Sequence, residues 1–303
     1  MEKRLLGNTG LAVTPLGFGA GQIGVLHTPR PESCRLLNVV LDSGVNLIDT
    51  AACYGDSEEK IGEFISHRRN EYVLVTKCGS HVDDDDPPEW TAENVRCSIE
   101  RSLRRMRTDR VDVLLLHSCT EQHLGNEEML NALQKCKSDG KARFIGYSGD
   151  DAALLGAVDV AAFDCIMTSV NMCDQQVIGM ALPRAAARGL GVIAKRPIAN
   201  SCWRDMSDYG GPYGSYVQPY QQRLKKMGFT PGSLGFDGDW VELALRFTIG
   251  QDGLHVALVG GRNPDHVRKN VELIAKGPLP DKTVQAVRDA WESCDDGSWK
   301  GQI

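Results

Sequence analysis

Val45-Asn46-Leu47-Ile48-Asp49 is a short apolar run typical of a buried strand, and the segments around it decide the fold. A helical pattern follows over Ser57–Ser66, and the next apolar run is Tyr72-Val73-Leu74-Val75-Thr76-Lys77. Two strands joined by a helix lie parallel in one sheet, because the helix returns the chain to the end at which the first strand began. This stretch therefore predicts a β-α-β unit.

The same alternation extends in both directions from this unit. It predicts six further strands, at 16–19, 111–117, 143–148, 165–170, 191–195 and 256–259, with helices between them. Eight such units favour an α/β fold closed into a (β/α)8 TIM barrel over an open sheet. Arg4–Val13 predicts an N-terminal β-hairpin. Since no break in composition divides the chain, we expect one domain over residues 1–303.

One stretch departs from the alternation. Residues 196–239 are rich in Gly, Tyr and Pro, and we expect them to be irregular. Because a loop of this length inside a barrel is usually functional, we expect a lid or a substrate wall here. The aromatic residues that it offers are Trp203, Tyr209, Tyr213, Tyr216 and Tyr220.

The composition argues against several classes of protein. The chain is 42% hydrophobic and 24% charged, and a formal net charge of −6 without a basic tail disfavours a nucleic-acid partner. No apolar run approaches the ~18 residues that cross a membrane, and no signal-type segment follows the N-terminus. Ten scattered cysteines without a Cys-x-x-Cys pair favour reduced thiols. We therefore expect a cytoplasmic protein, monomeric by default.

Reactive side chains stand at the ends of three successive predicted strands. Asp49, Lys77 and His117 end the second, third and fourth strands, and Tyr54 follows Asp49 by five residues. Each residue alone is more often a helix cap, a solvated strand end or a satisfied rim group. Because the carboxyl ends of barrel strands form the active-site rim, their coincidence predicts that the four side chains converge.

These residue types suit the protonation of a carbonyl oxygen. A free tyrosine has a pKa of ~10. An ammonium group at Lys77 would lower the pKa of Tyr54, while Asp49 would hold Lys77 in place and charged. His117 would donate a hydrogen bond to the carbonyl oxygen. No side chain supplies a hydride, so this chemistry requires a cofactor.

Nearly the whole chain, from about Leu5 to Leu273, resembles the aldo-keto reductase superfamily. The family's first signature is similar to the motifs Gly44–Ala51, Tyr54-Gly55 and Ser57-Glu58. The resemblance implies an NAD(P)(H)-dependent oxidoreductase that reduces an aldehyde or ketone to an alcohol. The reverse reaction, such as the oxidation of a sugar lactol, is equally implied.

The resemblance also implies a role for each of the four reactive residues. Tyr54 would be the general acid, Lys77 and Asp49 would tune it, and His117 would orient the carbonyl. The predicted walls of the pocket for a small carbonyl or sugar substrate are Trp90 and Trp203.

Cofactor-binding residues follow from the same resemblance. Ser148 matches a serine that contacts the nicotinamide carboxamide; the family usually has Asn next, whereas this chain has Gly149 and then Asp150. Met167 stands where the family often carries a Gln beneath the nicotinamide. The implied cofactor-binding residues are Gly19, Ala20, Ser148, Met167, Lys195, Arg196, Pro197, Gly260, Arg262, His266, Arg268 and Asn270.

The cofactor preference rests on residues 260–270, which resemble the segment that grips the adenosine end. A helix N-terminus binds phosphate through its free N–H groups and its dipole. Arg262 and Arg268 would add the charge that a 2′-phosphate requires. The segment therefore favours NADP(H) over NAD(H).

Two other functions fit parts of the pattern. Some relatives are cofactor-binding regulatory subunits with little turnover, although the four reactive residues argue against a purely binding role. A divalent-metal hydrolase on the same barrel is disfavoured, because such sites need several His and carboxylate groups on strand ends. Only His117 and Asp49 qualify, with Lys77 between them, so we predict no metal site.

Overall fold

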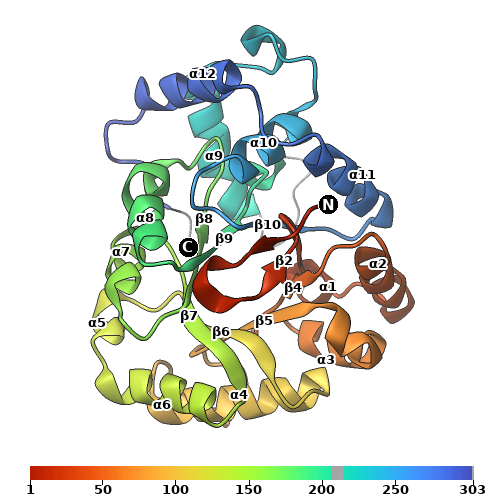
Figure 1. Ribbon diagram of the computed structural model, residues 1–303, viewed down its shortest axis with the longest axis vertical. Coiled ribbons are helices and arrows are strands. Elements are labelled where there is room, and N and C mark those ends of the chain that lie inside the picture. The colour runs from red at the N-terminus through yellow and green to blue at the C-terminus, as the bar shows by residue number, and fades with distance from the viewer. Residues whose placement is uncertain (206–213, 302–303) are drawn as a thin grey trace.

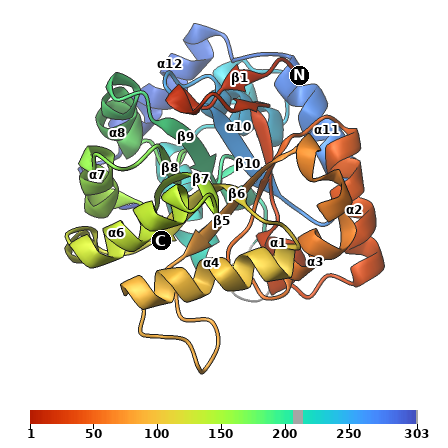
Figure 2. The ribbon, with the colours of Figure 1, turned by 60° about the horizontal axis from the view of Figure 1, so that its bottom comes forward.

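The centre of the protein is a closed parallel barrel. The computed structural model describes residues 1–205 and 214–301. Its barrel strands follow the order β10-β3-β4-β5-β6-β7-β8-β9, so consecutive strands are neighbours. Figure 1 looks onto one end of the barrel, and Figure 2 shows helices arranged around the outside of the strands. The predicted (β/α)8 fold is confirmed.

Strands and helices lie close to their predicted positions, with strand ends agreeing to within about two residues. The barrel strands are β3 (Leu16–Gly19), β4 (Leu47–Asp49), β5 (Val73–Cys78), β6 (Val111–His117), β7 (Ala142–Ser148), β8 (Cys165–Ser169), β9 (Gly191–Lys195) and β10 (Val256–Gly260). The main outer helices are α2 (Arg30–Asp42), α3 (Ser57–Phe64), α4 (Ala92–Met106), α6 (Glu127–Ser138), α7 (Asp151–Asp159), α8 (Gln176–Ala187), α10 (Trp240–Ile249) and α11 (Pro264–Ala275). Two short helices, α1 (Gly21–Val25) and α5 (Glu121–Leu124), occupy loops, and α12 (Asp281–Glu292) follows the barrel. Among the described residues, no helix is long and apolar enough to cross a bilayer.

Alternate residues of the strands fill the inside of the barrel, because successive side chains of a strand point to opposite faces. The strand residues of this interior cluster include Leu47, Val73, Val75, Val113, Leu115, Cys165, Met167, Ile193, Val256 and Leu258. The residues between them face outward and pack against the helices in a second, larger cluster. The barrel is therefore a filled core rather than a pore.

The N-terminal hairpin closes the amino end of the barrel. Its strands β1 (Arg4–Leu5) and β2 (Ala12–Val13) pair antiparallel. Leu6, Leu11 and Val13 join the interior cluster, and the Asn8 backbone N–H donates to the Gly189 carbonyl just before β9 at 2.8 Å. The carboxyl ends of the strands lie at the opposite end, which the hairpin leaves uncovered.

The prediction of an irregular stretch over residues 196–239 is wrong in part. A helix, α9 (Gly214–Met227), forms within it, and Val217, Tyr220, Leu224 and Met227 bury one face against α10 and α12. These residues recur at helical spacing, but Pro219 and the polar residues between them obscure the period in the sequence. Tyr209 and Tyr213 lie outside the described residues.

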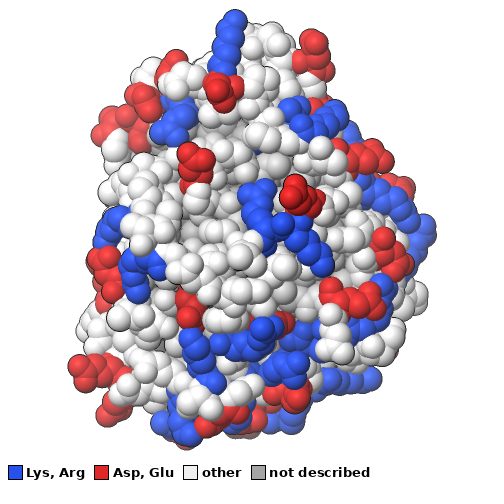
Figure 3. Space-filling view, in the orientation of Figure 1, with Lys and Arg blue, Asp and Glu red and all other residues white. Residues whose placement is uncertain are grey.

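A charged hollow of about 260 Å³ lies near the hairpin. Its cationic residues are Lys3, Arg69, Arg110 and Arg143. Arg69 and Arg143 both pair with Asp112, at 2.7 and 2.9 Å. On the face of the molecule seen in Figure 1, Figure 3 shows Lys and Arg side chains interspersed with Asp and Glu. The single carboxylate of Asp112 therefore offsets part of the positive charge of this hollow.

Replacing Gly7 with alanine should weaken the contact between hairpin and barrel. Gly7 has a φ of +53°, and a Cβ there would lie 2.4 Å from the Gly191 backbone nitrogen. Gly10 has a φ of +73° but no atom within 4 Å of its Cβ position. We expect Gly10→Ala to lose about 1 kcal/mol of unfolding free energy from backbone strain, and Gly7→Ala to lose about 1–3 kcal/mol more from overpacking. Urea unfolding measures both, and equal losses would contradict the proposed contact.

Candidate active site

The inward-facing series of the strands ends at the rim in polar side chains. In three strands a polar residue follows an interior apolar residue by two positions: Asp49 on β4, Lys77 on β5 and His117 on β6. Ser169 on β8 and Lys195 on β9 occupy the same position in their strands. Because side chains alternate along a strand, these residues face the axis of the barrel at its carboxyl end.

Lys77 lies buried at the centre of this rim, only 2% exposed. Its Nζ donates to Asp49 Oδ1 at 2.7 Å, to Asp49 Oδ2 at 2.9 Å and to the Thr50 carbonyl oxygen at 2.7 Å. An ammonium group has three hydrogens to donate. Asp49 and Thr50 therefore satisfy Lys77 within the protein.

Tyr54 and His117 lie beside this ion pair. The Tyr54 ring centroid is 4.9 Å from Lys77 Nζ. The same ring meets the His117 ring edge-on, with centroids 5.6 Å apart and an interplanar angle of 83°. Gly24 of α1 holds the Tyr54 loop closely, since a Cβ there would lie 1.9 Å from the Tyr54 carbonyl oxygen. The structure thus brings together Asp49, Tyr54, Lys77 and His117.

The charges around the site set the protonation of each group. Burial alone would lower the pKa of Lys77, but the charge and hydrogen bonds of Asp49, together with smaller effects of Tyr54 and Cys53, raise it overall. Burial lowers the pKa of His117 well below its usual value, and the positive charges of Lys77 and Lys195 lower it further. Lys77 is therefore an ammonium and His117 a neutral imidazole at neutral pH.

The pKa of Tyr54 moves in the direction opposite to the sequence-based expectation. Burial raises the pKa of the Tyr54 hydroxyl, while Lys77 acts to lower it, and burial prevails. The expectation considered only the ammonium and not the loss of water around the phenol. Tyr54 is consequently held as a protonated phenol beside a fixed positive charge.

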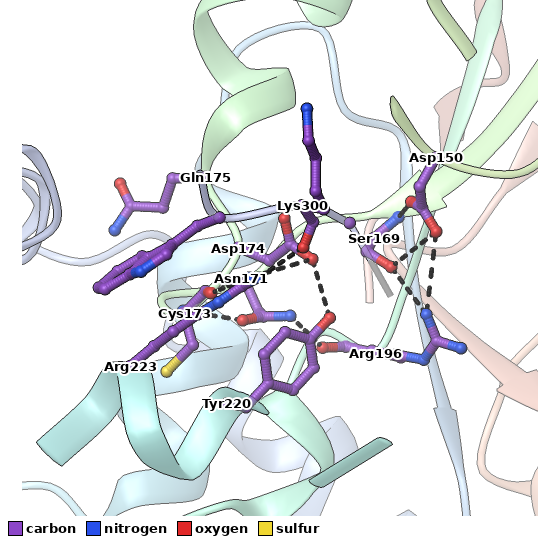
Figure 4. A network of polar contacts seen from close by, with 12 residues as sticks. Asp150, Ser169, Asn171, Cys173, Asp174, Gln175, Arg196, Tyr220, Arg223 and Lys300 are labelled. Carbon is purple, nitrogen blue, oxygen red and sulfur yellow. Dashed lines mark hydrogen bonds and ion pairs between the residues drawn. The ribbon is translucent and has the colours of Figure 1, made fainter. Parts of the chain in front are cut away.

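A second buried ion pair, between Asp150 and Lys195, stands across the rim, with Asp150 Oδ2 2.7 Å from Lys195 Nζ. Figure 4 shows Asp150 beside Ser169 and Arg196, and Asp150 Oδ2 lies 3.9 Å from an Arg196 nitrogen. Asp150 Oδ1 accepts hydrogen bonds from Thr168 Oγ1 at 2.8 Å and from the Ser169 backbone N–H at 2.7 Å. Arg196 donates to Ser169 Oγ at 3.0 Å. Lys195 and Arg196 thus belong to a salt-bridged rim, which any phosphate of a cofactor would have to engage alongside Asp150.

Figure 4 also shows how the C-terminal segment is anchored near this pair. Arg223 of α9 donates to the carbonyl oxygens of Cys173 and Lys300. Asp174 accepts from the Tyr220 hydroxyl at 2.9 Å, and burial raises the pKa of Asp174 to about 7. These contacts tie α9 and the C-terminal segment to the loop after β8.

The residues predicted to hold the adenosine end lie around the start of α11. Gly260 ends β10 beside Gly19 of β3, and a Cβ at Gly260 would approach the Gly19 carbonyl oxygen to 2.9 Å. Arg268 pairs with Asp265 at 2.7 Å on the surface. Arg262 is exposed and makes no ion pair with a described residue. His266 is also exposed, whereas Asn270 is buried.

The other predicted cofactor residues differ in depth. Ser148 ends β7 opposite His117, and Ala20 lies buried just after β3. Met167 is 1% exposed in the barrel interior, one inward-facing position below Ser169. Pro197 follows the salt-bridged pair, and its carbonyl oxygen accepts from Thr248.

The two predicted substrate residues make different contacts. Trp90 covers Gly79, which follows β5, since a Cβ at Gly79 would come within 2.4 Å of its ring. Its ring stacks on His123 at 5.6 Å. Trp203 instead stacks on Trp240 of α10 at 5.5 Å.

Sequence reasoning missed two residues of the site. Cys53 lies with its Sγ 3.4 Å from His117 Nδ1. In the sequence, Asp150 stands out only as a departure from the family pattern, although an acidic residue after β7 matches the basic end of β9. Among the described residues, no group of three or more His, Cys, Asp or Glu is placed to hold a metal ion.

The depressed pKa of His117 should make folding stability depend on pH. The folded protein binds fewer protons at His117 than the unfolded chain, whose histidine has a pKa of ~6.5. The unfolding free energy should therefore fall as the pH is lowered from about 7 to about 5. In His117→Gln, which cannot titrate, this part of the loss should disappear. Urea unfolding at both pH values tests this, and an unchanged pH dependence in the variant would contradict it.

Comparisons with known proteins show the family of this chain. The family model "Aldo/keto reductase family" matches residues 15–292. L-Galactose dehydrogenase from Arabidopsis thaliana is 30% identical, over 91% of this chain and 89% of its own length. D-threo-Aldose 1-dehydrogenase from a Pseudomonas species is 29% identical, over 88% of this chain and 91% of its own.

Solved structures give the same result. A putative aldo-keto reductase from Pseudomonas aeruginosa is 31% identical with a TM-score of 0.71, covering 90% of this chain and 94% of that one. The holo form of an aldo-keto reductase from Bacillus halodurans has a TM-score of 0.80 at 24% identity over 96% of both chains, which supports the fold alone. With the family model matching most of the barrel, this chain belongs to the aldo/keto reductase family of oxidoreductases.

Proposed function

We propose that this protein is an NAD(P)(H)-dependent oxidoreductase that interconverts a carbonyl group and an alcohol, with Tyr54 as the proton-transferring residue. The observation that carries the proposal is the position of the Tyr54 ring, 4.9 Å from Lys77 Nζ and edge-on to His117. A phenol, a fixed ammonium and a neutral imidazole together are suited to one substrate oxygen that gains or loses a proton.

The residues present fit a dinucleotide cofactor. A phosphate group suits Arg262, which is exposed just before α11, where the Asn263 side chain already accepts from the Asp265 N–H. Gly260 lets β10 approach β3 closely, since a Cβ there would lie 2.9 Å from the Gly19 carbonyl oxygen. Lys195 and Arg196 offer positive charge nearer the reaction site. When bound, a nicotinamide cofactor supplies or accepts the hydride.

In the direction of reduction, the chain's own residues handle the proton. Tyr54 donates its hydroxyl proton to the carbonyl oxygen of the substrate. Lys77 stabilises the phenolate that this leaves, and Asp49 keeps Lys77 charged and in place. Neutral His117 donates a hydrogen bond that orients the oxygen. In the direction of oxidation, Tyr54 accepts the alcohol proton.

The substrate class is proposed from the relatives. Two of them carry the names of sugar dehydrogenases, L-galactose dehydrogenase and D-threo-aldose 1-dehydrogenase. This favours a small sugar, oxidised at its lactol carbon, over other aldehydes and ketones. Trp90 beside the end of β5 is the proposed wall for such a substrate, since an aromatic face packs well on the C–H groups of a sugar ring.

A regulatory subunit that binds cofactor with little turnover is the second candidate. It differs from the first in one measurable property, the consumption of the cofactor. Sugars with NAD+ and NADP+, and aldehydes with NADH and NADPH, can be screened by absorbance at 340 nm. Cofactor that binds but is never consumed across both panels would favour the regulatory subunit.

Tyr54→Phe should lose turnover while keeping cofactor binding. Removing a general acid lowers kcat about 10²- to 10⁴-fold, whereas the phenyl ring preserves the packing. Tyr72→Phe is a matched control, because the Tyr72 hydroxyl bonds the Ile65 carbonyl oxygen outside the site. Steady-state kinetics and fluorescence titration with NADPH and NADH measure both properties. Undiminished turnover in Tyr54→Phe would refute its proposed role.

The preference for NADP(H) over NAD(H) is proposed to rest on Arg262. Arg268 already has a carboxylate partner in Asp265, so its charge is less available to a 2′-phosphate. Losing a hydrogen bond to a charged group is worth about 1.5–3 kcal/mol. We therefore expect Arg262→Ala to weaken NADPH binding at least tenfold without changing NADH binding, and Arg268→Ala to have a smaller effect. Equal affinity of the wild type for both cofactors would refute the preference.

A further inference from the structure

Cys53 contacts the proposed carbonyl-orienting residue from a neighbouring loop. It immediately precedes Tyr54 on the loop between β4 and α3, and the residue as a whole is exposed although protein atoms surround much of its thiol. Its Sγ lies 3.4 Å from Nδ1 of His117, which ends β6 two strands away. Within residues 1–205 and 214–301, no other side chain or backbone group hydrogen-bonds the His117 ring.

The chemistry of the two groups determines which of them donates. Burial raises the pKa of the Cys53 thiol, although Lys77 opposes this, so the thiol keeps its proton at neutral pH. Burial lowers the pKa of His117, with Lys77, Lys195 and Arg196 adding to the effect, so the ring is neutral. A neutral imidazole has one N–H donor and one nitrogen acceptor, and an imidazole nitrogen accepts more strongly than a thiol sulfur. The Cys53 S–H therefore donates to Nδ1.

This assignment fixes the tautomer of the ring. When Nδ1 accepts a hydrogen bond, the single proton of the neutral ring resides on Nε2. The two lysines whose charges act on the ring have other partners: Lys77 donates to Asp49 and Thr50, and Lys195 pairs with Asp150. Neither ammonium is engaged with the His117 ring.

We propose that Cys53 is a positioning residue whose S–H holds His117 in the Nε2–H tautomer, so that Nε2 donates to the substrate oxygen. This inference rests on the proposed function, since it deepens the role of His117 there. Cys53 itself does not touch the reacting atoms. Its effect passes through the orientation and tautomer of the imidazole.

Two substitutions at position 53 separate the effect on kcat of losing the hydrogen-bond donor from the effect of losing the sulfur atom. Cys53→Ala removes the donor, whereas Cys53→Ser replaces S–H with O–H and keeps it. We expect Cys53→Ala to lower kcat about fivefold, the factor that corresponds to the ~1 kcal/mol net contribution of one hydrogen bond, with KM nearly unchanged. Cys53→Ser should restore most of kcat. Cys97→Ala, an exposed thiol on α4, is the matched control and should leave kcat unchanged.

Nitrogen NMR of 15N-histidine-labelled protein reads the tautomer without any turnover. The chain has seven histidines, and the His117→Gln spectrum identifies the signals of His117. We expect the wild type and Cys53→Ser to show His117 with a protonated Nε2 and an acceptor Nδ1. Cys53→Ala should show a mixture of tautomers. Thermal melting checks that each variant is folded.

The outcomes distinguish this inference from the proposed function. A wild type without turnover on either panel, but with the expected tautomers, would refute the function and leave the contact intact. The inference would be overturned if the wild type turns over substrate and Cys53→Ala changes neither the His117 tautomer nor kcat. A wild-type His117 protonated on Nδ1 would overturn it as well.

Discussion

The ion pair between Lys77 and Asp49 is the constraint on which the site depends. An ammonium group that is 2% exposed inside an apolar barrel is costly unless every hydrogen finds an acceptor. Asp49 supplies two oxygens and the Thr50 backbone supplies the third. Removing one partner of such a buried pair typically costs ~3–5 kcal/mol, because the other charge is left without compensation. The carboxyl ends of β4 and β5 are therefore held together by this ion pair as well as by the hydrogen bonds between the strands.

The protonation states of the site follow from this fixed charge and from the second pair. Each of the two lysines pairs with its own carboxylate, Lys77 with Asp49 and Lys195 with Asp150, although burial lowers the pKa of Lys195 against the opposing effect of Asp150. Both lysines oppose a further positive charge on His117, and burial opposes it more strongly. Burial also keeps Tyr54 protonated, with Lys77 ready to stabilise the phenolate when the proton leaves. Burial and the neighbouring charges thus keep Tyr54 as a proton donor and His117 as a neutral hydrogen-bond donor beside it.

Local sequence signals predicted most of the barrel and only part of the region outside it. Each barrel strand is a short apolar run bounded by turn residues, and this pattern can be recognised without knowing what the strand packs against. Helix α9 was missed, because its buried residues Val217, Tyr220 and Leu224 are spread among polar residues and Pro219. The partner that buries this face includes Trp291 of α12, which is distant in the sequence. Such a helix owes its stability to tertiary packing more than to its own propensity.

The sequence by itself determined which residues reach the rim. Strand alternation places Asp49, Lys77 and His117 two residues beyond interior apolar positions, so their inward direction is encoded locally. Only the tertiary structure decided how these groups act on one another. It raised the pKa of Tyr54 through burial, paired Asp150 with Lys195, and set Cys53 against the His117 ring. These effects depend on distances between separate loops and on the exclusion of water, and neither quantity is a property of a single strand or helix.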